Sequence, residues 1–267
     1  MLESILSSKG IEYSDVYFRM DLRDGRLECL NKGFVKPYFE VKKADGDIFH
    51  ATDELCCLNF RRIKGKKIAT VHHLSEGSEG RSKLLDPLVR RATDLAVKYS
   101  DALIAVSEQT KKEIIEKYGV PEEKIFVMSH GPGPRFVNQG KKREKLIGFV
   151  GTLIKRKNVA GGLRAFKKFT ELEGTEGYRF VICGTGPLEE DLKKTAEDLG
   201  ISERVEFVSG LTDDELVDLY NRMEVFANSS MHEGLGLTAL EAMACGTPVV
   251  CFADAAIPDK SKFINAA

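Results

Sequence analysis

The stretch that decides the fold runs from residue 232 to residue 248: His232-Glu233-Gly234-Leu235-Gly236-Leu237-Thr238-Ala239-Leu240-Glu241-Ala242-Met243-Ala244-Cys245-Gly246-Thr247-Pro248. Its pattern is that of a glycine-bearing turn that leads into a short helix. Gly234 and Gly236 allow a tight turn and leave no side chains above the first helical turn. Strong helix formers follow over residues 237–245, Gly246 suits the left-handed position after a helix, and Pro248 blocks continuation. The stretch therefore predicts a helix with an open N-terminus.

An open helix N-terminus presents free N–H groups and the positive end of the helix dipole, which together suit a phosphate. Glu241 lies about one turn inside the helix, and helical side chains lean back toward the N-terminus. Its carboxylate is therefore placed to accept hydrogen bonds from hydroxyls of the group that carries the phosphate. Glu233 precedes the helix, and we expect it on the open side. A diphosphate flanked by a ribose and a hexose would fit, which indicates a nucleotide sugar; a purely structural helix is the alternative, because the spacing of two glutamates is weakly specific.

The composition is that of an ordinary globular protein, with 267 residues, 42% hydrophobic and 30% charged. This length is compatible with one large or two modest domains. The net charge of −1 gives no general electrostatic argument for nucleic acid or membrane. The six cysteines include no Cys-x-x-Cys pair and no metal-ligand spacing with histidine. With no signal peptide and no apolar run that could span a bilayer, we expect a protein of the reducing cytoplasm. Three of the cysteines lie in apolar segments and are expected to be buried: Cys183, Cys245 and Cys251.

Short apolar strands alternate with helices from residue 47 onward, whereas residues 21–46 show no clear period. Before residue 21 the sequence predicts the end of a helix over residues 1–10 and a strand over residues 15–20. The first series predicts strands at 48–50, 67–71, 101–106 and 124–128, and helices at 81–99 and 107–119, the latter capped by Ser107 and ended by Gly119. The second series predicts strands at 146–150, 180–183, 205–208, 225–227 and 249–252. It predicts helices at 159–172, 187–199 and 237–245, and a further helix that begins with the capping box Thr212–Glu215.

Strict alternation of strands and helices predicts parallel sheets with helices on both faces, hence the α/β class. The two series are separated by Gly131-Pro132-Gly133-Pro134 and a polar basic run. We therefore expect two Rossmann-like domains, residues 1–138 and residues 139–267, that face a cleft. The basic runs at 61–67 and 141–145 are expected to be solvated loops.

Several segments resemble those of one enzyme family. The 232–248 stretch resembles the Glu-x7-Glu signature of retaining glycosyltransferases of the GT4 group, which have the two-domain GT-B fold. Residues 151–158 resemble the family's loop of diphosphate-binding basic residues, in a variant with an Arg-Lys-Asn triplet; Thr152 stands where many members have arginine. Two cations directly after a parallel strand are also well placed to neutralise a phosphate, although an exposed basic loop is the alternative. Thr70-Val71-His72-His73-Leu74 resembles the family's Thr-Val-His-Asp-Leu strand end, so that His72 matches the cleft histidine; a structural histidine is the alternative.

The resemblance implies transfer of a hexose, mannose-like, from a UDP- or GDP-sugar to an unknown acceptor, with retention and without a metal ion or other cofactor. It assigns catalytic roles to His72 and Glu233. It assigns donor binding to Arg156, Lys157, Gly234, Gly236, Leu237, Thr238 and Glu241. The acceptor is expected to be a carbohydrate or a lipid-linked molecule.

Two motifs point to other chemistry. Gly184-Thr185-Gly186-Pro187 resembles the family's Gly-x-Gly-Pro turn and is also a partial dinucleotide fingerprint. Glu189 replaces the third glycine and would repel a pyrophosphate, so NAD binding is disfavoured. A simple strand–helix turn with Pro187 at the first helical position is preferred. Asp45-Gly46-Asp47 precedes a strand and is not expected to bind a metal ion.

The resemblance covers roughly residues 47–258 and lacks the family's first glycine-rich strand–loop and its last elements, so we expect truncation at both ends. An inactive or partial nucleotide-sugar-binding or scaffolding protein is therefore the second hypothesis. Basic residues on the 81–99 helix permit peripheral contact with a membrane, and surface solvation explains them equally well: Arg81, Lys83, Arg90, Arg91 and Lys98.

Overall fold

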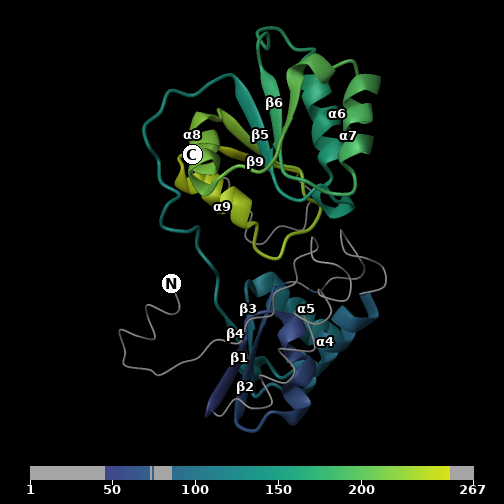
Figure 1. The fold of residues 1–267 in the computed structure, drawn as a ribbon, viewed down its shortest axis with the longest axis vertical. Helices are drawn as coiled ribbons and strands as arrows, with labels where there is room; N and C mark the ends of the chain where they lie inside the picture. Colours follow the sequence, from purple (N-terminus) through teal and green to yellow (C-terminus); the bar gives the residue numbers. More distant parts are fainter. Residues whose placement is uncertain (1–45, 73, 75–85, 253–267) are drawn as a thin grey trace. The chain divides into compact units, whose positions relative to one another are not determined.

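A computed structural model describes residues 46–72, 74 and 86–252. Within these residues the chain forms two β-sheets with helices between the strands (Figure 1), as the alternation predicted. One sheet has the strand order β1-β2-β3-β4, and the other has the order β7-β6-β5-β8-β9. Contacts divide the chain into two compact units, one built on residues up to 70 with 88–103 and the other on the remaining residues from 71 onward. The α/β class is confirmed, and the predicted boundary at residue 138 stays a prediction.

The first sheet follows the predicted order of elements closely. Ser107 caps its second helix by accepting a hydrogen bond from the N–H of Thr110, and Gly119 ends that helix with φ of 63°. The 3-10 segment between the first two strands was not predicted, because it shows neither helical nor strand periodicity. The predicted helix end and strand before residue 21 lie outside the described residues. The elements are β1 (Ile48–Ala51), η2 (Glu54–Arg62), β2 (Lys66–Val71), α4 (Asp86–Tyr99), β3 (Ala102–Ala105), α5 (Glu108–Tyr118), η4 (Glu122–Lys124) and β4 (Ile125–Val127).

The second sheet has its first strand at the centre. Strand β5 pairs in parallel with β6 on one side and with β8 on the other, with Ile147 opposite Val225. The chain order therefore reverses at β5, and ligands of such sheets bind beyond the carboxyl ends of the strands at this point. The elements are β5 (Leu146–Val150), η5 (Lys155–Lys157), α6 (Val159–Phe169), β6 (Arg179–Cys183), α7 (Glu189–Asp198), η6 (Ser202–Arg204), β7 (Val205–Val208), α8 (Asp213–Arg222), β8 (Val225–Asn228), α9 (Leu237–Ala244) and β9 (Val249–Cys251).

Helices cover both faces of the second sheet. Helices α6 and α7 lie on one face and α8 and α9 on the other (Figure 1), and each pair closes its own apolar cluster. Phe180 and Phe149 lie in the first cluster, and Phe226 and Met223 lie in the second. Two buried layers thus hold β5 and β8 rigidly from both sides, so their carboxyl ends form a fixed base for the loops that follow.

The predicted start of α7 and the predicted end of α6 differ from the structure by two or more residues. Helix α7 begins at Glu189 with Leu188 as its N-cap, so Pro187 lies before the helix and not at its first position. The reason is tertiary: the N–H of Leu188 donates to the carbonyl of Leu153 at 3.2 Å, which keeps this residue in the turn. Helix α6 ends at Phe169 and not at residue 172, because the next residues continue in tighter i→i−3 turns.

The basic run after the glycine–proline segment was expected to be solvated, and Arg143 contradicts this. Its guanidinium is half-buried and donates to the carbonyls of Tyr220, Asn221 and Met223 at 2.8–3.0 Å. It also donates to the carbonyl of Cys245 at 3.0 Å. These carbonyls lie at the C-terminal ends of α8 and α9, where unsatisfied acceptors and the negative end of the dipole attract a cation. Arg143 therefore caps two helices at once.

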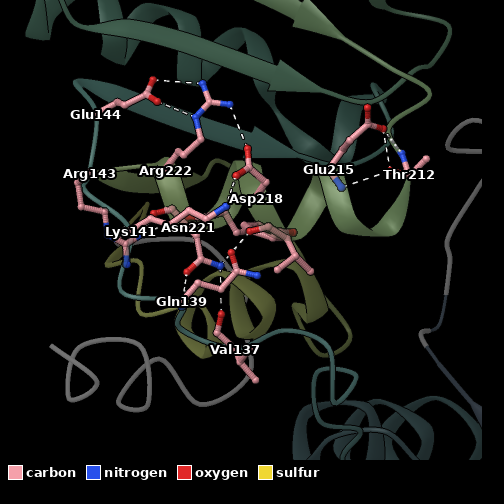
Figure 2. Close-up of polar contacts among 12 residues, drawn as sticks. Val137, Gln139, Lys141, Arg143, Glu144, Thr212, Glu215, Asp218, Asn221 and Arg222 are labelled. Atoms are coloured by element: carbon pink, nitrogen blue, oxygen red, sulfur yellow. Dashed lines mark hydrogen bonds and ion pairs between the residues drawn. The ribbon is translucent and has the colours of Figure 1, made fainter.

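The segment leading to Arg143 follows α8 through further polar contacts (Figure 2). Asn221 accepts a hydrogen bond from the N–H of Gln139 at 2.7 Å and donates to the carbonyl of Val137 at 3.1 Å. Glu144 pairs with Arg222 at 2.6 Å. An apparently featureless loop is thus held to one helix by side chains that are far away in the sequence.

The cysteines of the second sheet and its helices differ in burial. Cys183 and Cys245 are buried as expected, whereas Cys251 is only half-buried because β9 is an edge strand. Among the described residues, no helix has the length and apolar character needed to cross a membrane.

The capping box of α8 gives a first prediction. The hydroxyl of Thr212 accepts from the N–H of Glu215, and the Glu215 carboxylate accepts from the N–H of Thr212 at 2.7 Å. Thr212→Ala is expected to lower the free energy of unfolding by about 1 kcal/mol in urea titrations. Thr212→Ser keeps the hydroxyl and should cost much less; equal losses in the two variants would show that the cap is not responsible.

Candidate functional site

The loops after β5 and β8 lie side by side because their strands are neighbours. Two hydrogen bonds tie the loops together. The N–H of Met231 donates to the carbonyl of Arg156 at 2.9 Å, and the hydroxyl of Ser229 donates to the carbonyl of Lys157 at 2.7 Å. These contacts fix the register of the two loops, so the basic residues of one loop lie beside Glu233 of the other.

Glu233 binds both predicted cations. Its Oε1 accepts from Nζ of Lys157 and from the hydroxyl of Ser230, each at 2.6 Å. Its Oε2 accepts from Nη1 of Arg156 at 3.0 Å, and the same nitrogen donates to the carbonyl of His232 at 2.7 Å. Glu233 is 5% exposed, so this is a largely desolvated ion cluster. Its two cations and one carboxylate leave one net positive charge.

The expectation that Glu233 lies on the open side of the helix is therefore wrong. Burial alone would raise the pKa of its carboxyl, but the charge and hydrogen bond of Lys157, the hydroxyl of Ser230 and the charge of Arg156 outweigh burial and lower that pKa. Glu233 thus stays ionised and orients the two cations. The alternative of an exposed basic loop is also excluded, since the Lys157 side chain is only 13% exposed.

Glu241 has a different environment. It lies on α9, is half-buried, and its Oε2 accepts a hydrogen bond from the hydroxyl of Tyr220 at 2.9 Å. Burial raises the pKa of its carboxyl, and the Tyr220 hydroxyl opposes this only in part. The environments of Glu233 and Glu241 thus push their pKa values in opposite directions, which is typical of carboxylates with different roles.

The N-terminus of α9 is open, as the sequence predicted. Gly236 is its N-cap with φ of 79° and makes no side-chain cap hydrogen bond. The first helical hydrogen bond comes from the N–H of Ala239, which donates to the carbonyl of Gly236 at 3.0 Å. Within the described residues, the N–H groups of Gly236, Leu237 and Thr238 donate to no protein acceptor. Gly234 lies in the bend before them. These amides are available to an anion.

The glycines of the partial dinucleotide fingerprint have a structural role. A Cβ on Gly184 would lie 2.0 Å from the carbonyl oxygen of Gly151, and one on Gly186 would lie 2.4 Å from that of Leu153. The turn after β6 therefore packs its backbone directly against the loop that carries Arg156 and Lys157. This close approach is sufficient reason for both glycines, without a dinucleotide.

His72 directly follows β2 in the other sheet. Its ring stacks on that of His130, with ring centroids 5.8 Å apart and an interplanar angle of 19°. The Nε2 atom of His130 is buried and has no hydrogen-bond partner among the described residues. His73 and Asp45 lie outside the described residues. Within the described residues, no group of three or more His, Cys, Asp or Glu side chains is arranged to hold a metal ion.

Sequence reasoning missed Ser230, Tyr220 and Arg143. Only the position of Ser230, between a predicted strand and Glu233, could have indicated a role in the site. Tyr220 lies in the apolar pattern of α8 and gave no sign that its hydroxyl reaches another helix. Arg143 lay in a basic run, where surface solvation is the ordinary expectation.

These features define the class: an α/β protein with two sheets, whose second sheet carries a cluster of two cations and an uncapped helix N-terminus beyond the carboxyl ends of β5 and β8. Comparison with known families then gives the name of the group. Residues 134–260 match the family model described as "Glycosyl transferases group 1". Residues 33–132 match the model described as "Glycosyltransferase Family 4". The chain belongs to these glycosyltransferases, and the predicted family is confirmed.

Individual relatives of this chain are also named as glycosyltransferases. The chain is 34% identical over 178 residues to the D-inositol 3-phosphate glycosyltransferase of Corynebacterium jeikeium, covering 60% of this chain and 42% of the relative. It is 28% identical over 236 residues to the MMP alpha-(1->4)-mannosyltransferase of Mycolicibacterium hassiacum, covering 82% and 56%. The chain thus spans about half the length of these curated relatives. The structure of Anabaena Alr3699/HepE in complex with UDP and glucose has the same fold, with a TM-score of 0.64, 17% identity and coverage of 94% and 70%.

Proposed function

We propose that this chain takes part in transfer of a hexose, mannose-like, from a UDP- or GDP-sugar to an acceptor, with retention and without a metal ion. The observation that carries the proposal is the cluster of Arg156, Lys157 and Glu233 in the same sheet-end loops as the open N-terminus of α9. The names of the Corynebacterium and Mycolicibacterium relatives support a glycosyl transfer, and the latter supports mannose.

The donor's leaving group is a diphosphate, which departs as an anion and needs no general acid. It does need positive potential, and preorganised donors supply this best in a site with little water. The amides of Leu237 and Thr238 and the net positive ion cluster provide it here. Lys157 has three N–H donors, of which Glu233 takes one within the described residues, so the ammonium can also bind a phosphate oxygen.

The remaining roles complete the proposal. Glu241 accepts hydrogen bonds from the ribose. Glu233 orients the cations and, with His72, stabilises the positive charge that develops on the sugar. The role proposed for His72 is based on the family resemblance. A carbohydrate or lipid-linked acceptor, peripheral membrane contact and a cytoplasmic location are predictions from the sequence.

The proposal is tested by nucleotide binding and by transfer. UDP or GDP, or one of their sugars, should raise the melting temperature through mass action. Lys157→Ala should lower affinity or transfer at least about tenfold, equivalent to about 1.4 kcal/mol. Lys155→Ala is the matched control, because this neighbouring lysine is exposed and belongs to the same turn.

Equal behaviour of Lys157→Ala and Lys155→Ala would contradict the assigned site. Binding without any transfer or donor hydrolysis would favour the second hypothesis, a nucleotide-sugar-binding protein. If none of UDP, GDP and their sugars changes the melting temperature of the wild-type chain, both hypotheses are contradicted.

A further inference from the structure

Tyr220 is a polar residue in the centre of an apolar layer. It is fully buried on α8. Its ring packs edge-on against Phe136 at 5.9 Å between centroids and lies tilted against Phe226 at 5.8 Å. A phenylalanine would fill this layer equally well. The hydroxyl is therefore the part of Tyr220 that packing does not explain, and it points across to Glu241 on the neighbouring helix α9.

The Tyr220 hydroxyl is the hydrogen-bond donor to the Glu241 carboxylate within the described residues. Within the described residues no cation forms an ion pair with this carboxylate, in contrast to Glu233. Among the described residues, the thiols of Cys183 on β6 and Cys245 at the end of α9 also act on Tyr220, and burial raises the pKa of both thiols. The charge of Arg143 opposes the effect of burial on the pKa of the Cys245 thiol.

One bond from a fixed donor has two consequences for a carboxylate. It selects one side-chain rotamer, because the buried tyrosine cannot follow a moving partner. It also occupies one oxygen and leaves the other available: Oε2 of Glu241 is bound to Tyr220, and Oε1 accepts no hydrogen bond from the described residues. A carboxylate held in this way is prepared to accept from a hydroxyl of a ligand.

We propose that Tyr220 is a positioning residue of the donor site, whose hydroxyl holds Glu241 in the orientation that accepts a ribose hydroxyl. The inference rests on the proposed function, since it takes the ligand to be a nucleoside diphosphate. The inference adds one point to the proposed function. The preference for ribose over 2′,3′-dideoxyribose depends on Tyr220, which itself does not touch the nucleotide.

The test compares Tyr220→Phe with Tyr178→Phe. Tyr178 makes the same type of bond, to Glu224 at 2.9 Å, away from α9, and is the matched control. The affinities of UDP and GDP are measured against those of their 2′,3′-dideoxy analogues. In Tyr220→Phe the preference for the ribose form should fall about five- to tenfold, because a hydrogen bond to a charged group is lost, while the dideoxy affinity stays unchanged. A purely structural tyrosine would lower both affinities together.

A second measurement requires no nucleotide. The carboxyl carbon of Glu241, assigned by its loss in Glu241→Gln, is titrated by NMR. The Tyr220 hydroxyl lowers the pKa of this carboxyl, so Tyr220→Phe should raise it and Tyr178→Phe should not. An unchanged titration or an unchanged ribose preference in Tyr220→Phe would overturn the inference. If the wild-type chain binds neither nucleotide, the proposed function fails, and the titration alone then decides whether Tyr220 controls Glu241.

Discussion

Glu233→Ala is expected to lower the free energy of unfolding by about 3–5 kcal/mol, because it leaves two mostly buried cations without their partner. The side chains of Lys157 and Arg156 are 13% and 21% exposed, so water cannot fully replace the carboxylate. The two loops should also separate, because Glu233 holds the cations of one loop against the other. Urea titration followed by circular dichroism measures the loss.

The matched control for this prediction is Glu206→Ala. Glu206 pairs with Arg179 at 3.1 Å, and both side chains are about half exposed, so its loss should cost at most about 1 kcal/mol. If Glu233→Ala costs no more than Glu206→Ala, the buried cluster does not hold the loops together.

The pH dependence of stability should reveal the contribution of the Glu233 carboxylate. The pKa of Glu233 is lowered in the folded state, so its contribution is present above the unfolded pKa and is lost as pH falls through the folded pKa. Glu241 has the opposite sign, because its pKa is raised and its contribution is lost as pH rises through the folded pKa. Glu233→Ala should therefore flatten the acid limb of the stability profile, whereas Glu241→Gln should not.

Gly184→Ala is expected to lower the free energy of unfolding by about 2–5 kcal/mol, the sum of about 1–2 kcal/mol of backbone strain at positive φ and about 1–3 kcal/mol of overpacking. Gly184 has φ of 146°, and the added Cβ would lie 2.0 Å from the backbone oxygen of Gly151, which cannot turn aside as a side chain does. The loop carrying Lys157 must then move, so nucleotide affinity should fall with stability.

Gly174→Ala separates strain from contact. Gly174 has φ of 81°, and a Cβ there would meet nothing within 4 Å, so only the strain remains. The difference between the two variants measures the close approach of the two backbones. A Gly184→Ala variant as stable as Gly174→Ala would contradict the packing of the two loops.

Local patterns predicted those features that depend on neighbours in the sequence. The apolar run at β5 gave its bounds of residues 146–150, and the caps Ser107 and Gly119 gave the limits of α5. The turn glycines and the following helix formers gave α9 and its open N-terminus. The α/β class followed from the alternation of these elements alone.

Features that depend on distant partners could not be predicted in this way. Glu233 is buried because β8 pairs with β5, and the sequence does not show which strands are neighbours. Arg143 caps α8 and α9 through carbonyls that no residue pattern reveals. The bond from Tyr220 to Glu241 requires the packing of one helix on another. The sequence therefore predicted the local elements more fully than the contacts between them.

The central claim is that the amides at the start of α9 bind the diphosphate of a nucleotide sugar. It is tested most directly by following the ¹H–¹⁵N signals of Gly236, Leu237 and Thr238 while UDP or GDP is added, with the corresponding nucleoside as reference. The amide protons of these three residues should shift downfield with the diphosphate and remain unchanged with the nucleoside. Nucleotide binding that leaves all three signals in place would contradict the claim.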